Sequence, residues 1–293
     1  MKHCTCINSR KHRILIVLAV VLCVLCLLAF DSRLVVRKYA LESESVAGNV
    51  RIALVTDLHS CRYGDGQRTL IDAIARQAPD VILLGGDIFD NVQPDDHTKA
   101  FLEGVSGEYP CYYVPGNHEY WAGQARFDEM MAALEGYGVE ILMGDRVLIE
   151  VGGASIDLCG LQDPDAFGSS DKRRTYLENL DRLGSAADED AFTVLLAHRP
   201  EYFEAYSDYD FDLVLCGHAH GGQWRIPGIL NGVFAPDQGI FPKLAGGRYD
   251  RNDTTMIVSR GLARESTRIP RIFNRPELVI VEIGPRDERG EAK

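Results

Sequence analysis

Five short apolar runs, each followed within three residues by Asp, His or Asn, constrain the fold of this 293-residue chain most strongly. Each run has the length of a buried strand, and the polar side chains follow at residues 57–59, 87, 117, 198 and 218–220. Helical periodicity between the first three runs predicts β-α-β-α-β connectivity with parallel strands. Ligands of α/β sheets bind where such strands end. We therefore expect an α/β fold whose five strand ends converge on one edge of the sheet architecture.

The last of these motifs follows an apolar run at 212–216 and reads Gly217-His218-Ala219-His220. Histidines at positions i and i+2 on extended backbone point to the same side, so both can reach one metal cluster. Two polar loop residues would explain this short motif equally well when it is taken alone. Its meaning therefore depends on the other strand ends.

The remaining pattern predicts a single domain over residues 49–285, without an internal boundary or repeat, followed by a polar tail at 286–293. The expected strands are 49–55, 81–84, 112–114, 139–142, 193–197, 212–216, 255–258 and 278–283, with a hairpin formed by 146–151 and 154–161. The expected helices are 67–78, 97–102, 126–137 and 172–183. Residues 231–252 are rich in Gly and Pro and are expected to form a loop.

The N-terminus contains an uninterrupted apolar run at 14–30, close to the roughly 20 residues that span a bilayer. A cleaved signal peptide is the alternative, but small residues in the A-x-A pattern are missing at the end of the run. We expect a basic segment at 1–13, a single transmembrane anchor at 14–30 and a linker at 31–48. Four basic residues precede the run and three follow it, which favours a cytoplasmic N-terminus and an extracytoplasmic domain at the cell membrane.

Charge and cysteine content exclude some classes of protein. Residues 1–40 carry a net charge of +6 and residues 41–293 a net charge of −18, so we exclude nucleic acid as a main partner. Four of the eight cysteines belong to the anchor region, and the others are scattered singly, without the spacing of a structural zinc site. Cys111, Cys159 and Cys216 lie in or beside apolar strands, where a buried free thiol is expected, although pairing stays open.

The residue types at the strand ends indicate a metal centre. Carboxylate, amide and imidazole groups without thiolate suit manganese, iron or zinc. Seven candidate ligands are too many for one ion, whereas two ions about 3.5–4 Å apart form a known hydrolytic centre for phosphate esters. We expect two divalent metal ions, with manganese first and iron or zinc as alternatives.

The five motifs together resemble the calcineurin-like metallophosphoesterase family. They read Asp57-x-His59, Gly86-Asp87-x-x-Asp90, Gly116-Asn117-His118-Glu119, His198 and Gly217-His218-x-His220. This resemblance implies a four-layer α/β/β/α sandwich. The Gly-Gly-Gln after the last histidine, Ser259-Arg260-Gly261-Leu262 and the anchor are similar to a membrane-associated bacterial phosphodiesterase branch. One activity proposed for such relatives is cleavage of UDP-2,3-diacylglucosamine.

The resemblance also implies a role for each motif residue. It places Asp57, His59, Asp87 and His220 on the first metal and Asn117, His198 and His218 on the second, with Asp87 bridging both. His118 would be the catalytic histidine near the leaving group, and Asp90 and Glu119 would support the ligands from behind. Asp90 could equally be a turn cap. His97 is expected to be a solvated loop residue, and Arg199 either clamps a phosphate or lies on the surface.

We therefore expect a metal-dependent phosphodiesterase acting on a phosphodiester or pyrophosphate bond of a lipid-linked or membrane-proximal substrate. An anchored phosphomonoesterase or nucleotidase acting on soluble substrates is the alternative among enzymes. A non-catalytic scaffold is a further alternative, although this chain keeps every ligand of the motif. All proposed ligands lie beyond residue 40, so residues 1–40 are expected to be dispensable for a soluble, active enzyme.

Overall fold

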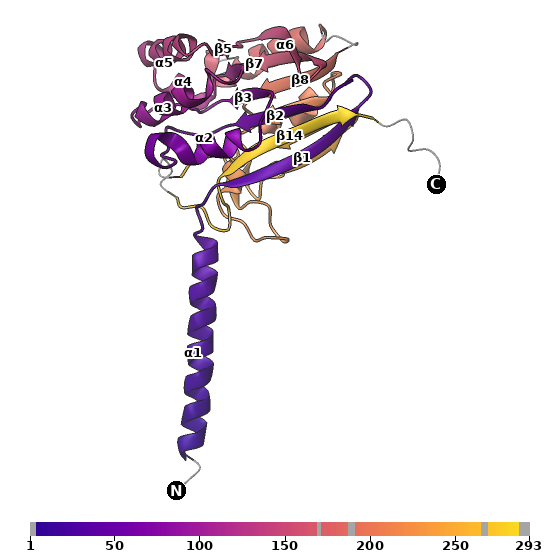
Figure 1. Ribbon diagram of the computed structural model, residues 1–293. Helices are drawn as coiled ribbons and strands as arrows, with labels where there is room; N and C mark the ends of the chain where they lie inside the picture. The colour runs from indigo at the N-terminus through magenta and orange to yellow at the C-terminus, as the bar shows by residue number, and fades with distance from the viewer. Residues whose placement is uncertain (1–3, 169–170, 187–190, 265–268, 287–293) are drawn as a thin grey trace, which may run out of the picture.

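The computed structural model describes residues 4–168, 171–186, 191–264 and 269–286. In these ranges an N-terminal helix, α1 (Cys4–Ala29), stands apart from an α/β domain built on two six-stranded sheets (Figure 1). The part of α1 from Arg10 to Ala29 has a mean hydropathy of 2.8. A 26-residue helix is about 39 Å long, which is sufficient to cross a bilayer. Length and composition fit either a single membrane span or a signal sequence.

The first sheet has the strand order β1-β14-β2-β3-β4-β5. Its strands are β1 (Val35–Ser43), β2 (Val50–Val55), β3 (Val81–Gly85), β4 (Cys111–Val114), β5 (Glu140–Ile141) and β14 (Glu277–Pro285). β2 to β5 run parallel, as the β-α-β pattern predicts, and β14 is antiparallel to β2. Every residue of β3 is buried, which is typical of a strand covered on both faces.

The second sheet has the strand order β12-β13-β9-β8-β7-β6. Its strands are β6 (Asp145–Val151), β7 (Ala154–Leu161), β8 (Phe192–Ala197), β9 (Leu213–Cys216), β12 (Gly247–Arg251) and β13 (Thr254–Val258). The predicted hairpin is confirmed as β6 and β7, which turn at Gly152 and Gly153. β7, β8, β9 and β13 are parallel, and β12 and β6 are antiparallel at the two edges.

Helices cover the outer face of each sheet. They are α2 (Arg68–Ala75), α3 (Asp96–Val105), α4 (Asn117–Trp121), α5 (Gln124–Gly136), α6 (Lys172–Gly184) and α7 (Phe203–Tyr206), with short 3₁₀ helices η1 (Asp65–Gln67), η2 (Pro164–Ala166), η3 (Pro200–Tyr202) and η4 (His220–Gly222). Leu70 of α2 and Phe101 of α3 pack on the first sheet, and Leu180 of α6 packs on the second. Leu54 and Leu196 lie in the apolar layer between the sheets. These layers confirm the expected α/β/β/α sandwich.

Three expectations about connecting segments are wrong. The expected linker at 31–48 contains β1, which pairs with β14 over nine residues, because Leu34 and Val36 pack against the outer core and Leu41 against the inner one. The expected loop at 231–252 contains β12 and the two-stranded ribbon of β10 (Phe234–Ala235) and β11 (Gly239–Ile240). His97, expected to be a solvated loop residue, lies in the first turn of α3, which is the helix expected at 97–102.

Two further expectations concern thiols and the chain ends. Cys111, Cys159 and Cys216 are buried and free, as expected. Residues 1–3 of the basic segment and 287–293 of the polar tail lie outside the described residues.

Candidate active site

The seven predicted ligands meet where strands of both sheets end, rather than at the edge of a single sheet. β2, β3 and β4 of the first sheet lead into Asp57 and His59, Asp87, and Asn117. β8 and β9 of the second sheet lead into His198 and into His218 and His220. The parallel strands of the two sheets therefore bring residues about 160 positions apart into contact, such as the backbone N–H of His218, which donates to Asp57 Oδ1 at 2.9 Å.

Asp57, His59, Asp87 and His220 form the first group, in which one potential ligand atom of each residue lies within 4.8 Å of the others. His220 Nε2 is 3.4 Å from Asp57 Oδ1, and His59 Nε2 is 3.6 Å from Asp87 Oδ2. All four residues have positive φ angles between 47° and 52°. This backbone conformation is unfavourable for residues other than glycine and is typical of functional sites.

Asp87, His198 and His218 form the second group, so that Asp87 is common to both. His198 Nδ1 lies 2.8 Å from the carbonyl oxygen of Gly85, which can only accept, so this nitrogen carries the proton. His198 Nε2 is thereby directed towards Asp87 Oδ2, at 3.2 Å. Asn117 is buried next to this group, because the backbone N–H of His118 donates to Asp87 Oδ1 at 2.8 Å.

The unpartnered atoms of the two groups match the ligands of a dinuclear centre. Buried polar atoms are nearly always hydrogen-bonded, so each exception indicates a missing partner. Within the described residues, the buried side-chain atoms without a hydrogen-bond partner include His59 Nε2, Asp87 Oδ2, Asn117 Oδ1, His198 Nε2 and His220 Nδ1. Carboxylate, amide and imidazole atoms in this number fit two divalent cations.

Two glycines allow the ligand loops to approach one another. A Cβ atom on Gly116 would lie 2.3 Å from Asp87 Oδ1, and a Cβ atom on Gly217 would lie 2.5 Å from Asp57 Oδ2. Both distances are far below van der Waals contact, and neither carboxylate can move without leaving its group. The glycines before Asn117 and His218 in the sequence motifs are therefore required by the packing of the site.

Burial and neighbouring charges set the protonation of the ligands. Burial lowers the pKa of His218 to about 3 and holds the pKa of His220 well below its usual value, so both rings are neutral near pH 7. Burial also lowers the pKa of His198, but the hydrogen bond to Asp87 and the negative charges of Asp87, Asp57 and Asp163 together outweigh this effect and raise it to about 10. A cation at the second group therefore competes with a proton on His198.

Asp90 acts both as a turn cap and as an orienting group, so the two interpretations of this residue hold together. Its Oδ1 accepts the backbone N–H groups of Val92 and Gln93, each at 2.8 Å. Its Oδ2 accepts from His59 Nδ1 at 2.9 Å, which leaves His59 Nε2 for the metal site. Carboxylates that fix the second nitrogen of a histidine in this way are a recurring feature of metal centres.

Glu119 holds the loop that carries Asp87. Its buried carboxylate accepts four backbone N–H groups at 2.8–3.0 Å, from Gly116, Asp87, Ile88 and Phe89. Burial raises the pKa of this carboxyl to about 7. Glu119 thus joins the loop after β3 to the start of α4, the two segments that supply Asp87 and Asn117.

His118 lies at the rim of the site and is partly exposed. Its ring is 4.3 Å from that of His59, and its Nδ1 is 2.9 Å from Asn91 Oδ1 and 3.5 Å from Asp90 Oδ2. Burial lowers the pKa of His118, but the hydrogen bond to Asp90 and the negative charges of Asp87, Asp90 and Glu119 together outweigh this effect, so the pKa lies above its usual value. A histidine held by one nitrogen in this manner can donate a proton from the other.

The sequence did not indicate that Arg199 lies at the centre of a network of charged side chains. Arg199 is not on the surface, because Asp163 binds its Nε at 2.5 Å and its Nη2 at 3.0 Å. Its Nη1 contacts Asp237 and lies 3.0 Å from His218 Nε2. All three nitrogens are engaged, which disfavours the phosphate clamp. Asp163 and Asp237 lie in segments expected to be loops, and no spacing in the sequence indicates that they reach a ligand.

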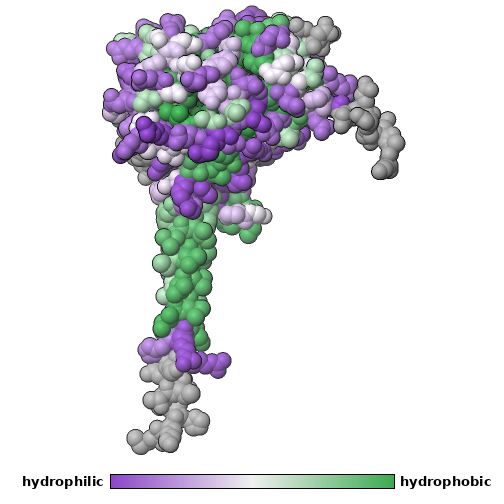
Figure 2. All heavy atoms as spheres, in the orientation of Figure 1, coloured by the Kyte–Doolittle hydropathy of each residue, from purple (hydrophilic) through white to green (hydrophobic). Residues whose placement is uncertain are grey.

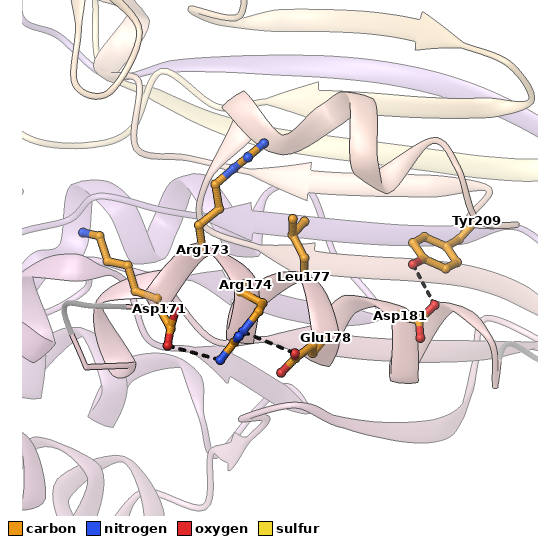
Figure 3. A pocket seen from close by; sticks show the side chains of 8 residues that line it. Asp171, Arg173, Arg174, Leu177, Glu178, Asp181 and Tyr209 are labelled. Atoms are coloured by element: carbon orange, nitrogen blue, oxygen red, sulfur yellow. Dashed lines mark hydrogen bonds and ion pairs between the residues drawn. The ribbon is translucent and has the colours of Figure 1, made fainter.

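A surface hollow of about 700 Å³ along α6 lies away from this site (Figure 3). It contains none of the predicted ligands, and its charged residues pair with one another, as Arg174 does with Asp171 at 3.1 Å and Glu178 at 3.6 Å. Surface ion pairs of this kind contribute little and do not require a ligand. The hollow therefore carries no catalytic function.

Residues 50–222 match the family described as calcineurin-like phosphoesterase, and the chain belongs to this family. The uncharacterized metallophosphoesterase YkuE of Bacillus subtilis is 30% identical over 238 residues, which cover 78% of this chain and 77% of that relative. Phosphodiesterase YaeI of Escherichia coli is 29% identical over 242 residues, covering 81% of this chain and 83% of that protein.

An uncharacterized metallophosphoesterase of Helicobacter pylori is 31% identical over 180 residues, which cover 59% of this chain. The chain matches only 45% of the length of that relative. Family membership agrees with the metallophosphoesterase fold described above, and one relative of the chain is named a phosphodiesterase. The His and Asp groups described above are consistent with the dinuclear metal site of this family.

Proposed function

We propose that this enzyme hydrolyses a phosphodiester or pyrophosphate bond in a lipid-linked or membrane-proximal substrate. The observation that carries this proposal is the short connection between α1 and the catalytic domain. Only residues 30–34 separate the end of α1 at Ala29 from the start of β1 at Val35. An extended chain covers at most about 3.6 Å per residue, so the domain stays within roughly 20 Å of the end of the helix.

We further propose that α1 is an uncleaved membrane span, with the N-terminus in the cytoplasm and the domain outside the cell membrane. The absence of a small-residue cleavage pattern and the slight excess of basic residues before the apolar run support this topology. Added protease should cleave the domain in spheroplasts without lysis. Protection until lysis would reverse the topology and place the substrate on the cytoplasmic leaflet.

The seven residues of the two groups would hold the cations, with Asp87 shared between them. When bound, two divalent cations supply an acidified water as the nucleophile and neutralise charge on the phosphoryl oxygens. Asp90 and the Gly85 carbonyl orient His59 and His198, and Glu119 fixes Asp87. His118 donates a proton to the departing oxygen. Manganese suits the ligand types best, with iron and zinc as the other candidates.

The preference for diesters can be tested with two chromogenic substrates. The full chain in detergent, supplied with manganese, should hydrolyse bis-p-nitrophenyl phosphate faster than p-nitrophenyl phosphate, and the Asp87→Ala variant should hydrolyse neither. A reversed preference would favour an anchored phosphomonoesterase or nucleotidase. New phosphomonoesters released from membrane lipid extracts, detected as inorganic phosphate after alkaline phosphatase is added, then identify the substrate class, including UDP-2,3-diacylglucosamine-type lipids, and failure of every lipid fraction would refute the lipid-linked part alone.

A further inference from the structure

Large exposed apolar residues of the domain are concentrated on one set of loops. Within the described residues after 30, seven of the eleven such side chains belong to this set, whereas Val92, Trp121, Met143 and Leu148 lie elsewhere. The seven, which we call the apolar patch, are Trp224, Ile226, Ile229, Phe234, Ile240, Phe241 and Ile269. Ile229 is 84% exposed and Ile240 71% exposed, which is unusual for isoleucine. A cluster of this size indicates an interaction surface.

The apolar patch is one continuous surface because its loops are hydrogen-bonded side by side. Residues 223–225 bond to 269–272, since Arg225 N–H donates to the Ile272 carbonyl at 3.0 Å and Gln223 Nε2 to the Ile269 carbonyl at 2.5 Å. On the other side, Val233 N–H donates to the Trp224 carbonyl at 2.9 Å and Phe241 N–H donates to the Val233 carbonyl at 2.8 Å. The loops that carry the apolar patch are therefore held together by backbone hydrogen bonds.

The loops of the apolar patch are hydrogen-bonded to the end of α1. Phe273, which directly follows Ile272 of these loops, donates its backbone N–H to the carbonyl oxygen of Ala29 at 2.8 Å. Arg275 lies 3.4 Å from Asp31 and donates to the carbonyl oxygen of Arg33 at 2.9 Å. In Figure 1 the orange loops project from the domain on the side where α1 joins it, and Figure 2 shows apolar residues on a projection beside the upper end of the helix.

Basic side chains gather at the same end of the domain. Arg33, Arg76 and Arg264 line a hollow of about 410 Å³ beside the start of β1. Lys243 is exposed and follows Phe241 of the patch by two residues. Because residues 41–293 carry a net charge of −18, these cations at the end of the anchor favour contact with anionic lipid headgroups.

We propose that the apolar patch is a second membrane contact, seated in the leaflet from which α1 emerges. This inference rests on α1 being a membrane span, as proposed above. Tryptophan and basic residues prefer the level of the headgroups, and isoleucine and phenylalanine prefer the hydrocarbon below it. The anchor holds the patch beside the bilayer, so the contact forms within one molecule and needs little intrinsic affinity.

The same contact would place the active site at the bilayer surface. Residues 217–241 carry both His218 and His220 and most of the patch. Asn274 donates to the carbonyl oxygen of His220 at 2.7 Å and is next to Phe273, which bonds to the end of α1. A substrate whose phosphate lies at the headgroup level would thus reach the metal ligands without leaving the membrane.

Trp224 provides a direct test, because the chain has only two tryptophans. The full-length Trp121→Phe variant, in nanodiscs of phosphatidylcholine and phosphatidylglycerol, keeps Trp224 as its single fluorophore. Replacing the lipids with lipids brominated near the headgroup should reduce its emission about twofold, since bromine quenches only on contact with a residue in the interface. The matched Trp224→Phe variant keeps Trp121, which belongs to α4, donates to Asp165 and is not part of the apolar patch, and should show no loss.

Four outcomes are informative. Quenching of Trp224 alone, abolished by the double variant Ile229→Asp and Phe241→Asp with unchanged hydrolysis of bis-p-nitrophenyl phosphate, supports the contact. A protein that stays with the nanodisc while Trp224 is not quenched overturns the contact and leaves the anchor intact. A protein that does not stay with the nanodisc overturns both. A change in emission that follows protein concentration in detergent would assign the patch to a second copy and overturn the membrane contact.

Discussion

Replacing Glu119 with Gln tests whether this residue holds the metal loop. The Glu119 carboxylate accepts two backbone N–H groups on each oxygen, at 2.8 and 3.0 Å on Oε1 and at 2.9 and 3.0 Å on Oε2. A glutamine of the same shape replaces one of these oxygens with an NH₂ group. The NH₂ group is itself a donor, so the two backbone N–H groups that the oxygen accepted lose their acceptor. Each buried donor left unpaired costs about 1–3 kcal/mol, so Glu119→Gln should lower the unfolding free energy by about 2–6 kcal/mol.

The measurement is urea unfolding of the full chain in detergent, at about pH 8 and with chelator present. At this pH the carboxyl is ionised, because its raised pKa is about 7, and the chelator prevents bound metal from contributing to stability. Glu103→Gln, on the exposed face of α3, is the matched control and should change the unfolding free energy by less than about 0.5 kcal/mol. A loss below about 1 kcal/mol for Glu119→Gln would refute the assigned role.

Three further variants test the site. Asp87→Ala removes the carboxylate common to both groups, so the purified protein should lose both metals and all hydrolysis; two equivalents of metal with normal turnover would rule out the site. His118→Ala should keep both metals but slow turnover roughly 10²–10⁴-fold, with partial rescue by a leaving group of low pKa, whereas loss of metal would make His118 a ligand. Asp90→Asn removes one of the carboxylates that raise the pKa of His118, the one that forms a hydrogen bond with its ring. A general acid works while protonated, so the alkaline limb of the pH–rate profile should move to lower pH; an unmoved limb would exclude His118 as the acid.

Elements with continuous periodicity could be predicted from the sequence. The buried strand β3 is an unbroken apolar run, and β2 and β8 each contain a single polar residue. The helices between the first strands show an apolar face, so the two βαβ units follow from local patterns. β1 could not be predicted in this way. Its residues alternate between partly buried and exposed, and its partner β14 lies more than 230 residues away, so only tertiary pairing defines it.

The candidate site, like the fold, contains residues that could be predicted from the sequence and residues that could not. The seven predicted ligands follow strand ends, and strand ends are visible in the sequence, so these candidates could be named from the sequence. Asp163 and Asp237 act through Arg199 and His218, and their positions depend on how loops after β7 and β9 fold over the second sheet. No sequence period describes such loops. The double role of Asp90 likewise required the position of His59 Nδ1, at 2.9 Å.

The position of β1 changes the expected effect of removing residues 1–40, because these residues include most of the strand that pairs with β14. Removing residues 1–30 leaves all nine pairs of β1 with β14, whereas removing residues 1–43 leaves the apolar strand β14 as an open edge. Open apolar edges pair with other chains. Both forms retain the apolar patch, so that surface cannot explain a difference between them.

We therefore expect the form lacking 1–30 to keep metal binding, hydrolysis of bis-p-nitrophenyl phosphate and its thermal midpoint in mild detergent. The form lacking 1–43 should aggregate or unfold several degrees lower, although it retains every ligand. Size-exclusion chromatography and thermal unfolding under identical conditions compare the two. Equal midpoints would show that β1 is a passive tether after all. A lower midpoint would show that the segment after α1 is part of the catalytic domain, so that α1 and the candidate active site are joined through one sheet.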